Sequence, residues 1–166
     1  MTESPADISV ATDADLNGIL ELQVANQIAR GGMLSAELPR ARIMAMMRDM
    51  PLIVAKRDAR VVGFLMTSTR TMNAELPVVR SMFAAYPGAS DAYVYGPVCV
   101  DASERGKGLA EAMFSALRRL APGREGVLFI RSDNAASLRA HRRMGMNEVA
   151  TFGLEGIDFS VFTYVG

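Results

Sequence analysis

The sequence predicts a single α/β domain spanning residues 1–166, and three observations support this fold class. Short apolar runs rich in β-forming residues stand at residues 52–55, 61–66, 93–100 and 126–131. Segments whose apolar residues recur at helical spacing lie between these runs. A glycine-rich turn at residues 105–110 joins one strand-like run to a helical segment, which is the strand–turn–helix order of α/β proteins.

Composition excludes several classes of protein. Hydrophobic residues make up 50% of the chain, enough to bury a core, yet no apolar run approaches the ~18 residues of a membrane span. Residues 1–8 are polar and lack the apolar segment of a signal peptide. The single cysteine, Cys99, excludes an internal disulfide and suits a reducing compartment, so we expect a cytoplasmic protein without a membrane partner. With one histidine and no ligand-spacing motif, we expect no metal.

Charge is balanced overall but unevenly distributed. The net charge is zero, which argues against a general nucleic-acid binder. All nine basic residues that follow Val100 lie within residues 105–143, a segment that holds only three acidic residues. Because this positive excess coincides with the glycine-rich turn, we expect an anionic ligand there rather than a merely solvated surface.

The first half of the chain predicts two helices and a hairpin. One helix begins at Asp13, with acidic residues in its first turn. The second runs from Ser35, as its cap, to Met50. The two β-rich runs at 52–55 and 61–66 flank a polar turn and form the hairpin.

The segment that follows the hairpin is an expected insertion. Residues 73–90 contain prolines and a glycine, and a short helix is predicted over Val78–Tyr86. The segment is too long for an ordinary loop, so we expect it to help form a site.

The run at residues 93–100 contains a local contradiction. Gly96 and Pro97 stand in its middle, and proline has no backbone N–H to donate to a neighbouring strand. We therefore expect a bulge or a splay in a central strand. Conflicts of this kind between local sequence and fold often mark functional sites.

The second half predicts alternating helices and strands. A helix follows the glycine turn and continues to Leu120 with a core-facing stripe, and a strand covers residues 126–131. A further helix from Asn134 to Met144 ends at Gly145, a typical C-terminal cap. Residues 148–152 and 159–164 form a last strand pair.

Three phosphate-binding patterns compete for the glycine turn. A P-loop requires GxxxxGK followed by Ser or Thr, which is absent. A dinucleotide fingerprint requires GxGxxG; Gly106 and Gly108 fit, but position 111 is glutamate. The third pattern combines Val98-Cys99-Val100 with Arg105-x-x-Gly108-x-Ala110, and a second block runs from Asn134 through His141 to Gly145-Met146.

These two blocks resemble the acetyl-CoA motifs of the GCN5-related N-acetyltransferase (GNAT) superfamily, and the resemblance covers nearly the whole chain. It implies a mixed, mostly antiparallel sheet with flanking helices and a splayed central strand pair. It also implies acetyl transfer from acetyl-CoA to a primary amine of a small molecule or peptide by direct attack. The residues it assigns to acetyl-CoA are Val98, Val100, Arg105, Gly106, Lys107, Gly108, Leu109, Ala110 and Asn134.

His141 departs from the family pattern, which commonly has tyrosine at this position as the acid that protonates the departing thiolate. An imidazolium can also donate a proton, so we expect His141 to be catalytic. The alternative is a structural histidine that faces its helix. Asn134 is expected both to contact CoA and to cap its helix.

Several roles stay open at this stage. The general base is not identified among the residues near the strand at 93–100, which are Asp91, Tyr93, Tyr95 and Asp101. Strand alternation places Cys99 opposite Val98 and Val100, which favours a buried structural cysteine over a nucleophile.

The acceptor wall is expected from residues 30–34, 73–90 and 153–158, and a homodimer is an open alternative to a monomer. Two other functions remain: a non-catalytic acyl-CoA-binding or regulatory module, and a nucleotide-binding oxidoreductase. Acetyl-CoA binding with turnover separates the enzyme from both.

Overall fold

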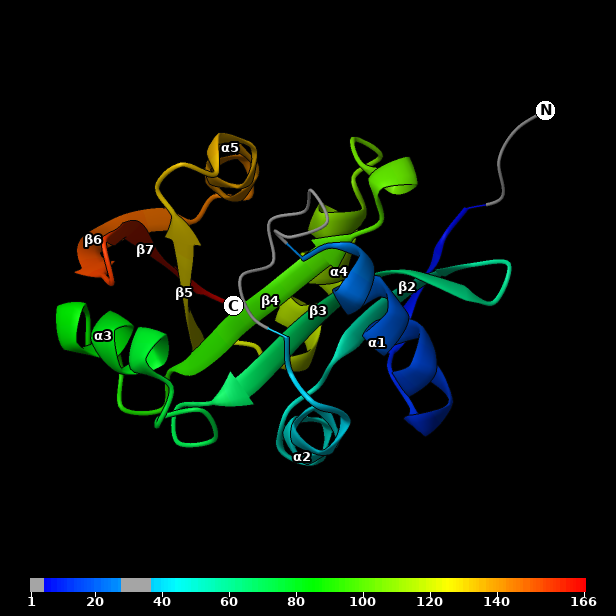
Figure 1. Cartoon of the computed structure of the whole chain (residues 1–166), viewed down its shortest axis with the longest axis horizontal. Coiled ribbons are helices and arrows are strands. Elements are labelled where there is room, and N and C mark those ends of the chain that lie inside the picture. Colours follow the sequence, from blue (N-terminus) through cyan, green and yellow to red (C-terminus); the bar gives the residue numbers. More distant parts are fainter. Residues whose placement is uncertain (1–4, 28–36) are drawn as a thin grey trace. The chain divides into compact units, whose positions relative to one another are not determined.

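The computed structural model describes residues 5–27 and 37–166 (Figure 1). Within them, seven strands follow one another across the sheet in the order β1-β2-β3-β4-β5-β7-β6. The pairs β1–β2, β2–β3, β5–β7 and β6–β7 are antiparallel, whereas β4–β5 is parallel. This mixed, mostly antiparallel sheet with helices confirms the predicted α/β fold class.

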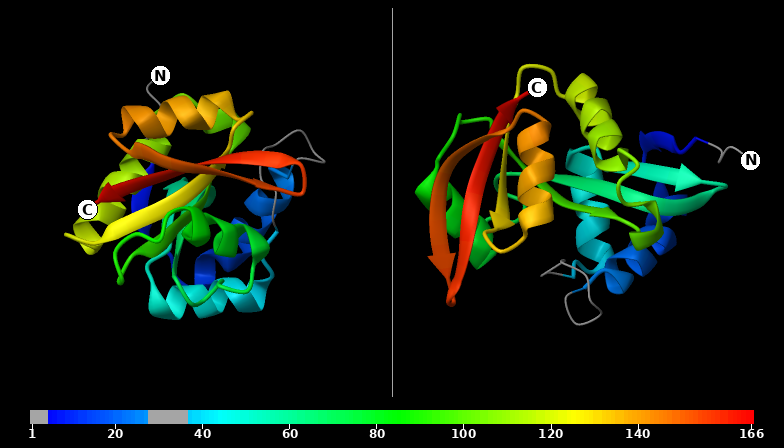
Figure 2. Two further views of the ribbon diagram at one scale, coloured as in Figure 1. Left: turned by 90° about the vertical axis from the view of Figure 1, so that its left-hand side faces the viewer. Right: turned by 90° about the horizontal axis from the view of Figure 1, so that it is seen from above.

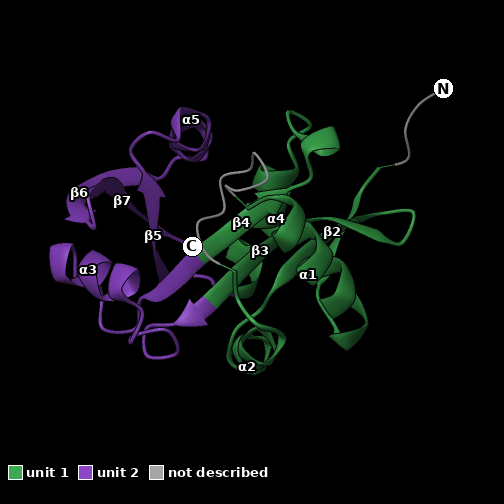
Figure 3. Ribbon diagram, viewed as in Figure 1, with its two compact units in different colours: residues 1–67, 96–120 green, residues 68–95, 121–166 purple. Residues whose placement is uncertain are grey.

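The chain forms two compact units, and the boundary between them crosses β3 (Arg60–Thr69) and β4 (Tyr93–Val100) (Figure 3). The first unit comprises residues 1–67 and 96–120, and the second comprises residues 68–95 and 121–166. A single domain over residues 1–166 stays a prediction.

The first unit packs helices on both faces of an antiparallel sheet. α4 covers one face of β1–β2–β3, and α1 and α2 cover the other (Figure 2). Besides β3 and the end of β4, its elements are β1 (Asp7–Val10), η1 (Asp13–Asp15), α1 (Leu16–Ala25), α2 (Arg40–Asp49), β2 (Ile53–Arg57), η3 (Ala102–Glu104) and α4 (Leu109–Leu120).

The predicted hairpin is β2–β3, and its turn is tighter than expected. Both turn residues, Asp58 and Ala59, have positive φ angles of 53° and 65°, and Arg57 pairs with Arg60. Positive φ at both central residues gives the turn a twist that matches the right-handed twist of the strands. The strand β1 was not predicted, because its four residues carry too short an alternation to separate them from a polar terminus.

Helix boundaries in this unit correct two expectations. The predicted cap Ser35 lies outside the described residues, and residues 37–39 are not helical; α2 begins at Arg40 after Pro39. Pro39 has an extended backbone, with ψ of 155°, so α2 can begin only after it. In α4 the apolar stripe buries Met113 and Leu117, but Leu120 at its last position is 51% exposed.

The second unit also has helices on both faces of its strands. α3 and α5 lie on opposite faces of β5–β7–β6 (Figure 2). Besides β4, its elements are α3 (Pro77–Ala85), β5 (Glu125–Arg131), α5 (Ala135–Arg143), β6 (Asn147–Leu154) and β7 (Ile157–Val165). These bounds confirm the short helix expected near residues 78–86, the strand at 126–131 and the final strand pair.

The core of the second unit lies under α3. Its buried members come from α3, β4, β5 and β7 and from the residue just before β4, and Phe129 and Phe152 pack at its edge. They are Val79, Met82, Ala92, Val94, Val127 and Val161. Since successive side chains of a strand alternate between faces, Val94 faces this core and the next residue, Tyr95, faces the side of α5.

Glu125 joins three segments of the second unit at the start of β5. Its carboxylate accepts hydrogen bonds from the Tyr86 hydroxyl at 2.7 Å, the Ala89 backbone N–H at 2.6 Å and the Thr163 hydroxyl at 2.6 Å. Burial raises the pKa of Glu125, but these hydrogen bonds outweigh burial and leave the pKa below its ordinary value. The ionised carboxylate thus holds the end of the 73–90 segment against β5 and β7.

Strand β4 meets its parallel neighbour only at its beginning. Tyr93 pairs with Gly126 and Val94 with Val127, and the paired register stops before Gly96 and Pro97. This is where the sequence predicted that strand pairing would be disturbed.

Candidate active site

The glycine turn lies between η3 and α4 in the first unit. Gly106 and Gly108 have φ angles of +78° and +79°, a left-handed conformation that glycine adopts readily and other residues rarely do. A Cβ atom built on either residue would meet no protein atom within 4 Å, so the protein leaves space beside the backbone. The N–H groups in the first turn of an α-helix have no partner within the helix, so this backbone offers donors to an anion.

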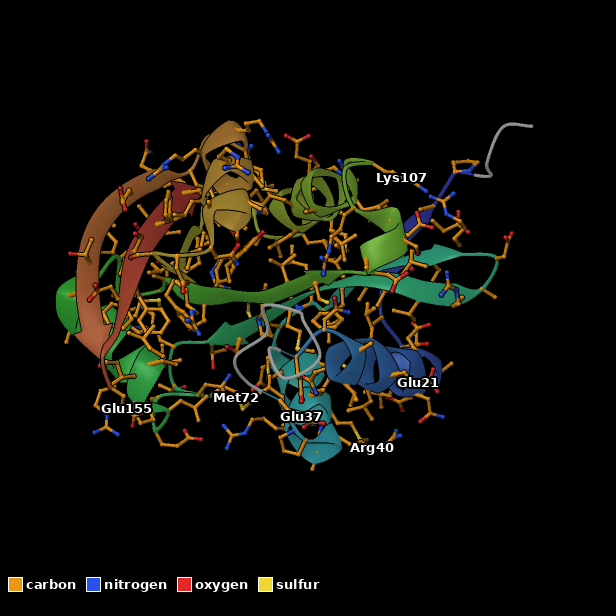
Figure 4. The ribbon with its side chains drawn as sticks, turned by 45° about the horizontal axis from the view of Figure 1, so that its top comes forward. Glu21, Glu37, Arg40, Met72, Lys107 and Glu155 are labelled. Carbon is orange, nitrogen blue, oxygen red and sulfur yellow. The ribbon has the colours of Figure 1, made fainter. Side chains whose placement is uncertain are left out.

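Both cationic side chains of the turn contact acceptors of the protein itself. The Arg105 guanidinium donates to Asn26 Oδ1 at 2.8 Å and, more weakly, to the Val100 carbonyl oxygen at 3.4 Å. Lys107 (labelled in Figure 4) lies 3.4 Å from Glu104 Oε2. The expected contact of these two side chains with phosphate stays a prediction.

Glu104, just before the turn, is nearly fully buried, with 3% of its surface exposed. Arg57 at the end of β2 donates to both of its carboxylate oxygens, from Nε at 3.0 Å and from Nη2 at 2.9 Å. The hydrogen bonds from Arg57, with those from Lys107, hold the pKa of Glu104 below its ordinary value. Sequence reasoning missed this ion pair because Arg57 and Glu104 are 47 residues apart.

The end of β4 orients Val98 and Val100 toward the edge away from β3. The backbone N–H of Asp101 donates to the Val62 carbonyl oxygen of β3 at 2.8 Å. Backbone groups of alternate residues point to the same edge of a strand, so those of Val98 and Val100 point to the opposite edge. Cys99 between them is buried, as expected, and burial raises the pKa of its thiol to about 12.

Asn134 caps α5 in the second unit. Its side-chain oxygen accepts the Ser137 backbone N–H at 3.2 Å, which confirms the predicted N-cap. At the other end of α5, Gly145 has a φ of +88° and its N–H bonds the Arg142 carbonyl oxygen at 3.0 Å, which confirms the predicted C-terminal cap. These two caps fix where α5 begins and ends, and hence where His141 lies.

His141 is buried, with 3% of its surface exposed, and both ring nitrogens have partners. Nδ1 lies 2.8 Å from the Ser137 carbonyl oxygen, which can only accept, so Nδ1 carries the proton. Nε2 lies 3.1 Å from the Tyr95 hydroxyl. Burial lowers the pKa of His141, and the hydrogen bond to Ser137 only partly offsets this effect.

The resting state of this pair follows from these contacts. A neutral His141 with its proton on Nδ1 accepts the Tyr95 O–H at Nε2. Burial raises the pKa of Tyr95, so Tyr95 keeps its proton. The imidazolium proposed from the sequence is therefore a minor form near neutral pH. The pairing of Tyr95 with His141 was not predicted; the only sequence signal is a tyrosine on the strand next to Gly96 and Pro97.

The other residues considered as bases have structural contacts. The Tyr93 hydroxyl forms a short hydrogen bond with that of Tyr164. The Asp91 carbonyl oxygen accepts from Arg124 at 2.8 Å, and the Asp101 carboxylate accepts the Ser103 hydroxyl. None of these contacts identifies a base.

Residues 5–27 and 37–166 contain no group of three or more His, Cys, Asp or Glu side chains that could hold a metal ion. In the same ranges, every helix is too short or too polar to cross a membrane. The expected acceptor segment at residues 30–34 lies outside them, and the roles expected for 73–90 and 153–158 stay predictions.

Comparison with known proteins gives a family and a fold. Residues 19–146 match the model of the acetyltransferase (GNAT) family. A search of curated proteins finds no significant match.

Similar solved structures span nearly the whole chain. An acetyltransferase of the GNAT family from Streptococcus agalactiae aligns with a TM-score of 0.74 and 14% identity, covering 99% of each chain. An N-acetyltransferase from Staphylococcus aureus Mu50 aligns with a TM-score of 0.72 and 21% identity, covering 98% of this chain and 99% of that one. A phosphinothricin acetyltransferase from Sinorhizobium meliloti, solved with acetyl-CoA, aligns with a TM-score of 0.69 and 19% identity, covering 98% and 89%.

Proposed function

Because the chain belongs to the acetyltransferase (GNAT) family and is an acetyl-CoA-dependent N-acetyltransferase, we propose that it acetylates a primary amine by direct attack on the thioester. The observation that carries the proposal is the glycine turn at the start of α4, with open space beside Gly106 and Gly108. Direct attack requires no acetylated cysteine, and the burial and raised pKa of the Cys99 thiol make that residue a poor nucleophile.

We assign the pyrophosphate of acetyl-CoA to the backbone of residues 106–110. The two glycines admit phosphate oxygens close to the main chain, where a side chain would obstruct them. The N-terminal end of α4 adds a favourable field for an anion. Arg105 and Lys107 contribute positive charge nearby, while their contacts hold the turn in place.

The pantetheine arm is assigned to the main chain of Val98 and Val100. Their backbone groups point to the edge of β4 away from β3, and an extended arm can pair with such an edge as an added strand does. Asn134 is proposed to contact the same donor molecule through its side-chain NH2 group, because the cap of α5 uses the side-chain oxygen.

His141 is the proposed source of the proton for the departing thiolate, acting through Tyr95. When His141 is protonated, its Nε2–H donates to the Tyr95 oxygen and releases the Tyr95 O–H for the sulfur. The proton on Nε2 moves to the Tyr95 oxygen as the Tyr95 proton moves to the thiolate, which leaves a thiol and a neutral imidazole. No phenolate forms at any point, in keeping with the raised pKa of Tyr95.

We propose that the acceptor amine belongs to a small molecule or a peptide and that the reaction needs no metal. We also propose a cytoplasmic enzyme, whose oligomeric state is either a monomer or a homodimer. Direct amine attack needs a neutral amine, donors for the developing oxyanion and a proton for the thiolate, none of which requires a metal. The lack of net charge supports a partner other than nucleic acid.

Thermal unfolding with added ligands, followed by an amine screen, tests this function. Millimolar acetyl-CoA should raise the melting temperature, whereas NADH should leave it unchanged. The screen should then detect free thiol with at least one primary amine. An unchanged melting temperature with acetyl-CoA would refute the donor assignment. Tight binding without turnover on a broad amine panel would favour the non-catalytic alternative.

A further inference from the structure

The entrance to the glycine turn is a buried ion pair rather than an ordinary loop. Glu104 immediately precedes the turn, its side chain is 4% exposed, and Arg57 contacts both of its oxygens. The Arg57 side chain is itself only 13% exposed. A bidentate pair of this kind fixes both partners in one relative geometry. The end of the β2–β3 hairpin therefore holds the residue from which the turn starts.

The negative charge of Glu104 would oppose the binding of pyrophosphate at the adjacent turn. Glu104 directly precedes the first residue of the turn, and a carboxylate repels phosphate unless a nearby cation neutralises it. Arg57 and Lys107 both lie within ion-pair distance of it, at 2.9 Å and 3.4 Å. Of these two cations Arg57 is the closer and the more buried, so its field is the less screened by solvent.

The second attachment of the turn leaves its backbone as the main contact for a ligand. Arg105 donates to Asn26, whose own amide donates to the Leu22 carbonyl oxygen at 2.9 Å near the end of α1. With the Arg105 and Lys107 side chains both in contact with protein acceptors, affinity for an anion depends strongly on where the N–H groups of the turn lie. Residues that fix the start of the turn thus influence binding without touching the ligand.

We propose that Arg57 is a positioning residue for the donor: it neutralises and fixes Glu104, and so shapes the glycine turn for the pyrophosphate of acetyl-CoA. The inference rests on the proposed assignment of the pyrophosphate to that turn. Arg57 touches neither the amine nor the thioester in this scheme, so it acts on the binding of the donor.

The chain offers a closely matched control. Lys56, the neighbour of Arg57 on β2, pairs with another largely buried carboxylate, that of Asp15, at 3.1 Å. The Lys56 pair lies at η1 and not at the turn. Lys56→Gln therefore removes a cation from the same strand and leaves a buried carboxylate without that partner, but should not alter the turn.

Isothermal titration of the full chain with acetyl-CoA and with S-acetylpantetheine, which lacks the pyrophosphate, tests the proposal. Arg57→Gln should weaken acetyl-CoA binding about tenfold, the order of coupling expected between neighbouring charged groups, and leave S-acetylpantetheine binding unchanged. The double variant Arg57→Gln/Glu104→Gln should recover most of the affinity, because no buried carboxylate then lacks its cation. Arg57→Lys should recover part of it, and Lys56→Gln should bind like the wild type.

Salt dependence separates electrostatics from a general loss of structure. Raising the salt should shrink the defect of Arg57→Gln, since it screens the repulsion between Glu104 and the pyrophosphate. Wild-type affinity for acetyl-CoA in Arg57→Gln would overturn the proposal, as would an equal loss for acetyl-CoA and S-acetylpantetheine. If the wild type itself bound both compounds equally, the assignment of the pyrophosphate to the turn would fail instead.

Discussion

Gly108→Val is the sharpest test of where the donor binds. Gly108 has a φ of +79°, and a Cβ atom built there meets nothing within 4 Å. The new side chain therefore collides with no protein atom near its Cβ, and obstructs only what enters the open space. Gly156, in the β6–β7 turn, has the same φ of +79° and the same open surroundings, so Gly156→Val is a matched control for backbone strain.

The two variants should lose similar stability and differ in affinity. A non-glycine residue in the left-handed region costs roughly 1–3 kcal/mol, and each kcal/mol lowers the melting temperature of a chain of this size by about 2–4 °C. A charge-assisted hydrogen bond contributes roughly 1.5–3 kcal/mol. Losing one such bond to phosphate in Gly108→Val raises the Kd for acetyl-CoA about 10–150-fold, at about 1.4 kcal/mol per factor of ten.

Titration calorimetry with acetyl-CoA and thermal unfolding of the free proteins give both quantities. The expected pattern is a matched drop in melting temperature, with affinity lost only in Gly108→Val. Equal affinity in the two variants would refute the placement of the pyrophosphate. A much larger loss of stability in Gly108→Val than in Gly156→Val would refute the view that its side chain meets only open space.

Three further predictions concern proton transfer, acid stability and thiol reactivity. His141→Phe and Tyr95→Phe should each lower kcat about 10²-fold, the lower range for general acid catalysis, with little change in the KM for acetyl-CoA, measured by thiol release on an active amine. Glu125→Gln should destabilise the protein by about 1–3 kcal/mol at neutral pH, because the partly buried hydrogen-bond network loses its negative charge and one of its two acceptor oxygens. Folding lowers the pKa of Glu125, so its contribution to the free energy of unfolding is fully present above its ordinary pKa of 4.5 and is lost as pH falls through the lower folded pKa. In acid unfolding followed by circular dichroism, the stability of Glu125→Gln should therefore fall less steeply with pH than that of the wild type. Cys99 should react with iodoacetamide far more slowly in the folded protein than in urea, because its thiol is buried and its pKa is raised to about 12.

A specific result would contradict each of these predictions. His141→Tyr restores the residue common in the family and should retain more activity than His141→Phe; normal turnover in His141→Phe across the pH range would remove the histidine from the mechanism. For Glu125, parallel acid-unfolding curves of variant and wild type would contradict the predicted linkage. For Cys99, equal labelling rates in buffer and in urea would show that the thiol is accessible.

Local sequence signals located the elements well where they rest on turn and cap chemistry. Gly145 and Asn134 marked the ends of α5, because a left-handed cap and a side-chain acceptor are needed within one turn of the helix. The predicted bounds of the strand around Gly96 and Pro97 match β4. Pro97 also indicated where the pairing of β4 with β5 would stop, because proline has no backbone N–H to donate. The signals were weakest for β1 and for the start of α2, where a short strand and the turn before Arg40 carry little periodicity.

The candidate site shows the same division. The open turn at Gly106 and Gly108 could be predicted from local sequence, because glycine readily adopts the left-handed backbone that the turn has. Its contact with phosphate stays a prediction. The protonation state of His141 was not, because it depends on burial and on the Tyr95 hydroxyl, 46 residues away in the chain.

The sequence by itself thus determined the α/β class, the family motifs, and a glycine turn between a strand and a helix. These features are written in neighbouring residues, which fix local dihedral angles and hydrogen bonds. Only the tertiary structure decided that Arg57 holds Glu104, that Arg105 contacts Asn26, and that His141 is paired with Tyr95. Such pairings depend on which distant segments fold together and exclude water, and no local pattern records that.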